Sequence, residues 1–129
     1  MTTKAATYLF GIVFILVGIL GFTDNGIISD SEDAIFHADK VHSTVHLVTG
    51  ISFLAFAMMF PLYTTKFLSV FGILYLVIGV LGLISIGVNG MTTVLGFLHV
   101  NGADNILHVT LGILIFLAGF GLPRFKDIA

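Results

Sequence analysis

The stretch Phe10-Gly-Ile-Val-Phe-Ile-Leu-Val-Gly-Ile-Leu-Gly-Phe22 recurs later in the chain as Phe71-Gly-Ile-Leu-Tyr-Leu-Val-Ile-Gly-Val-Leu-Gly-Leu83. Followed onward with one residue of drift, the match places His37, His46, Gly50, Ile51 and Pro61 on His99, His108, Gly112, Ile113 and Pro123. Self-similarity of this length indicates a tandem repeat. The predicted unit is a helix, a loop and a second helix, used over about residues 5–62 and again over about residues 67–124.

Four apolar segments follow from this repeat, at Ala5–Phe22, Val45–Phe60, Phe67–Ile86 and Ile106–Leu122, and none contains a charged residue. Each approaches the roughly 20 residues that cross the hydrocarbon core of a bilayer. The second and fourth segments are short, so we expect each helix to begin within the preceding polar segment. Because a backbone in lipid must satisfy its own hydrogen bonds, the segments predict helices. We therefore predict an all-α membrane protein with a single domain over residues 1–129, a bundle of four transmembrane helices running up-down-up-down.

The composition agrees with membrane residence and excludes several classes of protein. Of 129 residues, 57% are hydrophobic and only 9% are charged, whereas about a quarter of the residues are charged in soluble domains. The formal net charge of −2 argues against a nucleic-acid partner. The chain has no cysteine, which excludes a disulfide scaffold, thiol catalysis and a thiolate metal site.

The basic residues are divided unequally between the two ends of the predicted bundle. Lys40 alone lies on the side of the two long loops, and the other four lie at the opposite end: Lys4, Lys66, Arg124 and Lys126. The positive-inside rule then places this end, with both termini, in the cytoplasm. All five histidines fall on the outer side with six of the seven acidic residues, namely Asp24, Asp30, Glu32, Asp33, Asp39 and Asp104.

The glycines and the outer loops carry simpler structural predictions. Glycines within the apolar segments allow helix backbones to approach closely, so we interpret them as packing residues. In the first loop, Ser29-Asp-Ser-Glu32 has the spacing of a capping box and predicts a short interfacial helix. The second loop is glycine-rich and more apolar, and we expect it to fold over the outer mouth of the bundle.

The most informative polar residues lie where each loop enters the second helix of its unit. His42 and His46 are one turn apart on one helical face, and Asp104 and His108 occupy the equivalent positions. The same face continues inward through small residues, which mark helix contacts, so the imidazoles are expected to point into the bundle. The remaining histidines are expected in the loops that cover it: His37 and His99.

One interpretation of this cluster is a hydrogen-bonded cap that closes the outer end. Asp104 or Asn105 then caps the fourth helix, and Ser43 or Asp39 caps the second. Neutral imidazoles bridge to the loop backbone. Asn101 belongs to the same set of structural residues.

A second interpretation is a transition-metal site. Three imidazoles and one carboxylate, from His42, His46, Asp104 and His108, suit zinc, copper or iron. His37 and His99 are secondary candidates. Each half of the chain supplies only two of these ligands, so the site requires the two repeat units to close around the ion.

A third interpretation is haem. His46 and His108 are candidate axial ligands across the bundle, with Gly50 and Gly112 leaving room for a flat ring one turn deeper. No haem-attachment motif accompanies them.

The sequence favours a non-catalytic accessory or binding role over an enzyme. It lacks a helical His-Glu-x-x-His motif and a nucleophile setting. No ionisable residue lies at mid-membrane, where ion pathways usually place one. The expected partners are the lipid bilayer and either a second copy of the chain or another membrane protein, because the phenylalanine-rich helix faces suit both lipid and protein.

The chain also resembles a bacterial family of small four-helix membrane proteins known only as a domain of unknown function. The motif of that family before its fourth helix, Asn-x-x-Asp-Asn-x-Leu-His, is matched by Asn101, Asp104, Asn105, Leu107 and His108. In its first motif, Asn-x-x-His-Asn-x-x-His, His42 and His46 match, while Asp39 and Ser43 replace the asparagines. The resemblance implies a four-helix bundle in a prokaryotic inner membrane and no established activity.

Overall fold

The computed structural model describes residues 1–126 of the chain. It contains four long helices: α1 (Thr3–Gly21), α2 (Lys40–Met59), α3 (Thr64–Ile86) and α4 (Gly102–Gly121). A 3-10 turn, η1 (Pro61–Tyr63), joins α2 to α3. All four helices are long and apolar enough to cross a membrane. The predicted set of four long apolar helices is thereby confirmed, each a candidate membrane span, and α2 and α4 begin in the polar segments, as expected.

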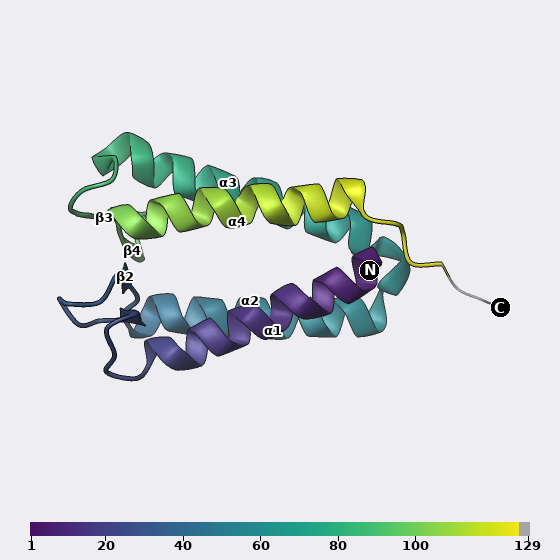
Figure 1. Cartoon of the computed structure of the whole chain (residues 1–129), viewed down its shortest axis with the longest axis horizontal. Coiled ribbons are helices and arrows are strands. Elements are labelled where there is room, and N and C mark those ends of the chain that lie inside the picture. The colour runs from purple at the N-terminus through teal and green to yellow at the C-terminus, as the bar shows by residue number, and fades with distance from the viewer. Residues whose placement is uncertain (127–129) are drawn as a thin grey trace.

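The helices form two hairpins that lie one above the other (Figure 1). Helix α1 packs along α2, and α3 packs along α4, with much less backbone contact between the pairs. Both hairpins use glycines at equivalent positions. Gly11 and Gly50 face each other in the first hairpin, as Gly72 and Gly112 do in the second. The prediction that these glycines are packing residues is confirmed, and the two hairpins pack in the same register.

The space between the hairpins is filled by side chains, mainly aromatic ones. The rings of Phe14 in α1 and Tyr75 in α3 are 5.1 Å apart, and Phe14 also lies 5.4 Å from Phe53 in α2. Phe53 and Ile115 are fully buried between the helices. Close packing of these rings gains dispersion contacts and ring pairs add about 1 kcal/mol each, so these contacts hold the two hairpins together.

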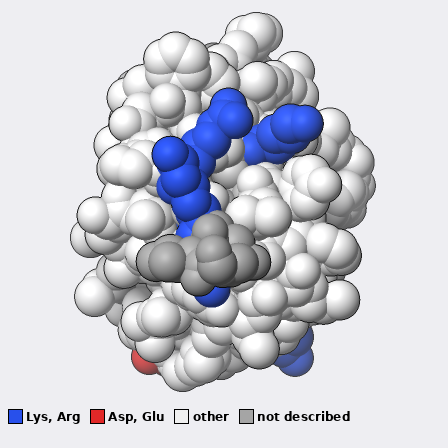
Figure 2. Space-filling model, turned by 90° about the vertical axis from the view of Figure 1, so that its right-hand side faces the viewer, with Lys and Arg blue, Asp and Glu red and all other residues white. Residues whose placement is uncertain are grey.

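Both described terminal segments and the α2–α3 connection lie at one end of the molecule (Figure 1). The backbone N–H of Thr3 donates to the carbonyl of Pro123, and the Thr3 and Thr64 hydroxyls are 2.9 Å apart. Figure 2 looks onto this end and shows basic side chains gathered on it, with acidic atoms visible only at its lower margin. We call it the basic end.

The opposite end is closed by the two long loops. The first loop holds a short parallel pair, β1 (Ile28–Ser29) with β2 (Phe36–His37), and the second forms an antiparallel hairpin, β3 (Met91–Val94) with β4 (Leu98–Asn101). Residues Val94, Leu98 and Val100 of this hairpin are buried against Ile78 and Val45. As expected, the second loop covers the bundle.

The short helix predicted at Ser29–Glu32 is wrong. Ser29 lies in β1, and its hydroxyl donates to the carbonyl of Asn25 instead of capping a helix. The Asn25 side chain accepts from the backbone N–H groups of Ile27 and Ile28. These local bonds satisfy the backbone in a turn, which removes the advantage of a helical start.

Candidate functional site

Three histidines meet beneath the loops. His42 and His46 lie on the first turns of α2, and His108 lies on the second turn of α4. One ligand nitrogen from each ring lies within 4.8 Å of the other two. The residues are only 2%, 7% and 3% exposed. We call His42, His46 and His108 the three-histidine group.

The rings of this group pack directly against one another and against an aromatic floor. The His42 ring centroid is 4.5 Å from that of His46 and 5.6 Å from that of His108. Below them, the ring centroid of Phe14 lies 6.1 Å from that of His46, and Tyr75 and His108 make a T-shaped contact at 5.7 Å. The group is therefore held by packing from all four helices together.

The hydrogen bonds of the three rings differ. Nδ1 of His42 donates to the carbonyl of His99 at 3.1 Å, since a carbonyl can only accept. This bond leaves the Nε2 lone pair of His42 free, which is how outer partners orient a histidine that binds metal. Nδ1 of His46 and Nδ1 of His108 are buried without a hydrogen-bond partner among residues 1–126. The described protein therefore leaves polar atoms of this group unsatisfied.

Asp104, the fourth ligand predicted for a metal, lies nearby but is engaged elsewhere. Its Oδ2 accepts from the backbone N–H of Asn101 at 2.8 Å and from that of His37 at 3.2 Å. The first bond completes a capping box with the Asn101 side chain at the start of α4. The second bond ties the first loop to α4. The carboxylate is not among the atoms that form the three-histidine group.

The secondary metal candidates are not brought together. Nε2 of His37 is 3.7 Å from a carboxylate oxygen of Asp30. His99 is exposed, and its Nδ1 lies 2.9 Å from the hydroxyl of Thr93. The ring nitrogens of both loop histidines therefore lie outside the three-histidine group.

The predicted capping residues are partly reassigned. Asp39 caps α2, accepting from the N–H of His42 at 2.8 Å, as one of the two expected alternatives. Ser43 does not cap: its Oγ is buried with no partner among residues 1–126. Helix α4 is capped by Asn101, not by Asn105, whose amide donates to the carbonyl of Gly87 at the end of α3. The chain places Asn105 one turn inside α4, too deep to reach the unpaired N–H groups at its start.

Two small cavities flank the group. One, of about 200 Å³, is lined by all three histidines together with Thr49 and Tyr75. The other, of about 100 Å³, lies between His46, His108, Asp104 and Phe14. Three imidazoles beside an open space is the arrangement of zinc sites that keep one position for water or another ligand. Tyr75 was not predicted as a site residue; in α3 it occupies the position that Phe14 occupies in α1, and it carries a hydroxyl that Phe14 lacks.

The room predicted for a haem beside Gly50 and Gly112 is absent within residues 1–126. A Cβ at Gly50 would lie 2.6 Å from the side chain of Ile15, and one at Gly112 would lie 2.8 Å from Cα of Leu76. Helices α1 and α3 fill this space. These glycines serve helix packing, so that part of the argument for haem was wrong.

Comparison with known proteins adds the family but no activity. No curated protein and no solved structure gives a match to the chain. A family model described as a domain of unknown function, DUF4383, matches residues 4–121. The match spans all four helices and both polar motifs, which confirms the resemblance seen in the sequence. The chain is therefore a member of the DUF4383 family.

Proposed function

We propose that this protein is a small integral membrane protein with a non-catalytic binding role, and that its ligand is a divalent transition-metal ion. The three-histidine group holds the ion, with His42, His46 and His108 each giving one nitrogen. The observation that carries the proposal is their convergence: three buried ligand nitrogens within 4.8 Å of one another.

The unsatisfied nitrogens favour metal over a purely structural cap. Burying a polar atom without a partner costs about 1–3 kcal/mol, and two such imidazole atoms are present in the group. Nothing in the described residues offsets that cost, whereas coordination uses imidazole lone pairs directly. Imidazole ligands suit zinc, copper and iron, and three of them with an open position are typical of zinc. We take zinc as the first candidate.

The capping interpretation remains the second candidate, and a different set of residues supports it. Asp39, Asn101 and Asp104 satisfy backbone N–H groups at the starts of α2 and α4. Asn105 does the same for a carbonyl at the end of α3. The polar cluster thus divides into two sets. The acids and amides make the hydrogen bonds that close the end of the bundle, and the imidazoles of the three-histidine group are not required for that closure. On this division, capping and metal binding are compatible.

The basic end supports a proposal for orientation. We place both termini on the cytoplasmic side of a prokaryotic inner membrane and the three-histidine group near the outer surface, by the positive-inside rule. The chain has no cysteine, so a single cysteine at exposed Asp33 reports its side unambiguously. A membrane-impermeant maleimide should label Asp33→Cys in intact cells, and protection of that cysteine would reverse the orientation.

The metal proposal is tested on protein purified in mild detergent, with a non-histidine tag and without chelators. We expect about one zinc, copper or iron ion per chain by elemental mass spectrometry and its loss in His46→Ala and His108→Ala. His99→Ala is the matched control, because that histidine is exposed and outside the group.

Two outcomes decide against the metal proposal. A metal-free wild-type protein that takes up no zinc, and loses thermal stability in His46→Ala and His108→Ala, would favour the cap. A Soret band lost in the same variants would identify haem instead. Circular dichroism of each variant confirms that a lost ion reflects lost ligands and not unfolding.

A further inference from the structure

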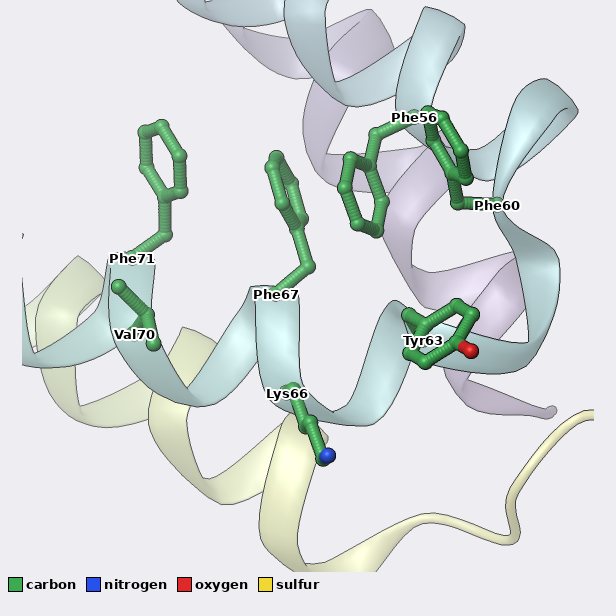
Figure 3. A pocket seen from close by; sticks show the side chains of 7 residues that line it. All are labelled: Phe56, Phe60, Tyr63, Lys66, Phe67, Val70 and Phe71. Carbon is green, nitrogen blue, oxygen red and sulfur yellow. The ribbon is translucent and has the colours of Figure 1, made fainter.

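A second site lies near the other end of the molecule. A groove of about 420 Å³ runs between α2 and α3, and most of its lining side chains are aromatic. Its lining residues, shown in Figure 3, are Phe56, Phe60, Tyr63, Lys66, Phe67, Val70 and Phe71. We call it the phenylalanine groove. None of its residues belongs to the three-histidine group.

The rings fix the shape of the groove. Phe56 of α2 stacks on Phe67 of α3 with centroids 4.2 Å apart and planes 16° from parallel. Buried Phe53 supports the floor, since it meets both Phe67 and Phe71 edge-on at 4.8 Å. Ring pairs of this kind stabilise one arrangement. The groove is therefore preformed, with an apolar interior between two membrane-spanning helices.

The polar atoms lie at the rim of the groove. Figure 3 shows Phe67 and Phe71 projecting from α3 into the groove, while the ammonium group of Lys66 points away from the rings. The stem of Lys66 lines the apolar space and its charge leaves it, as lysines do at membrane surfaces. Tyr63 is 55% exposed at the same rim. Tyrosine is enriched at membrane–water interfaces because its ring is apolar and its hydroxyl is polar.

A second hollow continues the site around the basic end. It has a volume of about 320 Å³, shares Phe60 and Tyr63 with the phenylalanine groove, and adds Lys4 and Phe125. Nζ of Lys4 lies 4.4 Å over the Phe125 ring. Lysines thus border both hollows, and the charged groups visible on this face are mainly basic (Figure 2).

We propose that the phenylalanine groove binds an anionic phospholipid, with an acyl chain against the rings and the phosphate at Lys66. Charge complementarity selects this occupant: the groove opens among membrane-spanning helices, and its rim carries positive charge without a carboxylate among the lining residues. Basic pockets between transmembrane helices are known to hold anionic headgroups. A zwitterionic lipid fills the same apolar space but gains less from the lysine.

The absence of tryptophan from the chain provides a direct test. A single reporter, Phe60→Trp, is placed at the groove, and the protein is reconstituted in phosphatidylcholine vesicles containing brominated phosphatidylglycerol or brominated phosphatidylcholine. Bromine quenches a tryptophan that it touches. We expect brominated phosphatidylglycerol to bind about fivefold more strongly than phosphatidylcholine, the effect of one lysine at an anionic surface. Adding Lys66→Gln should bring that ratio close to one.

Phe120→Trp is the matched control. It makes the same substitution in α4, where the adjacent Gly119 packs on Ser69 of α3, so its depth is close to that of the groove. Phe120 is 79% exposed and outside the groove, so its tryptophan should show no preference between the lipids. An equal preference at both positions, or one that survives Lys66→Gln, would overturn the proposal. A groove tryptophan that neither lipid quenches would show that protein, such as a second copy, covers the groove.

Discussion

His42 and Asp104 occupy equivalent positions at the start of the second helix in each hairpin, yet their side chains make different contacts. His42 turns its ring into the three-histidine group. Asp104 turns its carboxylate towards the backbone N–H groups of Asn101 and His37. The capping duty in the first hairpin falls on Asp39 instead. Equivalent positions in the two hairpins therefore hold a candidate metal ligand in one case and, in the other, a carboxylate that joins the first loop to α4.

The largest change in stability should come from removing the Asp104 carboxylate that joins the two hairpins. Asp104→Ala leaves two N–H groups without their acceptor at a buried site, and we expect a loss of about 3 kcal/mol in the free energy of unfolding. Asp39→Ala removes one cap contact and should cost about 1 kcal/mol. Unfolding in mixed micelles of dodecyl maltoside and dodecyl sulfate measures both variants.

Asp104→Asn provides the control, because its amide oxygen still accepts while its charge is gone. It should recover part of the loss. If Asp104→Ala proves no more costly than Asp39→Ala, the bond across the hairpins to His37 contributes nothing, and the comparison between the two positions fails.

The next largest effect, stabilisation by zinc, should distinguish His42 from Asp104. A ligand at a hundredfold excess over its dissociation constant stabilises a protein by about 2.7 kcal/mol. We expect a stabilisation of this order for the wild type and for Asp104→Asn, because Asp104 is outside the three-histidine group. His42→Ala should abolish it. Thermal melts in detergent with and without zinc provide the measurement.

Loss of the zinc response in Asp104→Asn as well would restore Asp104 to the ligand set. It would mean that the carboxylate leaves the capping box when the ion binds. A zinc response that survives in His42→Ala would instead remove His42 from the site. His42 and Asp104 would then be alike in having no part in metal binding.

Much of this fold could be predicted from the sequence because its determinants are local and repeated. Unbroken apolar runs fixed the four helices, and glycines at matching intervals indicated where helices pack. Histidines spaced four residues apart on a small-residue face predicted that His42 and His46 would point inward, and they do. Each of these signals depends on neighbours within one or two helical turns.

The loops and the role of Asp104 could not be predicted, because they depend on partners far along the chain. The N–H group that binds Asp104 across the hairpins belongs to a residue 67 positions away. The β1–β2 and β3–β4 pairs are two and four residues long, too short for an alternating pattern to stand out. Aspartate serves equally well as a cap and as a ligand, and only the position of the His37 backbone distinguishes the two here.

The smallest effect is expected for substitutions of the glycines that pack on Ser43, which follows His42, and on Asn105, which follows Asp104. A Cβ at Gly21 would meet the Ser43 hydroxyl, and a Cβ at Gly82 would meet the Asn105 amide. Ser43 has no partner among residues 1–126 and can turn aside, whereas Asn105 is held by the carbonyl of Gly87. Overpacking costs about 1–3 kcal/mol. We expect Gly82→Ala near the middle of that range and Gly21→Ala at its lower limit.

The same micelle titration ranks these two variants, and Gly82→Ala combined with Asn105→Ser is the control. Serine is the residue at the equivalent position of the first hairpin, so it should relieve the clash and recover part of the lost stability. Equal losses for Gly21→Ala and Gly82→Ala would mean that the contact of Asn105 with Gly87 does not hold its side chain in place. The second hairpin would then be as adaptable as the first at this level, and the difference between them would lie in His42 and Asp104 alone.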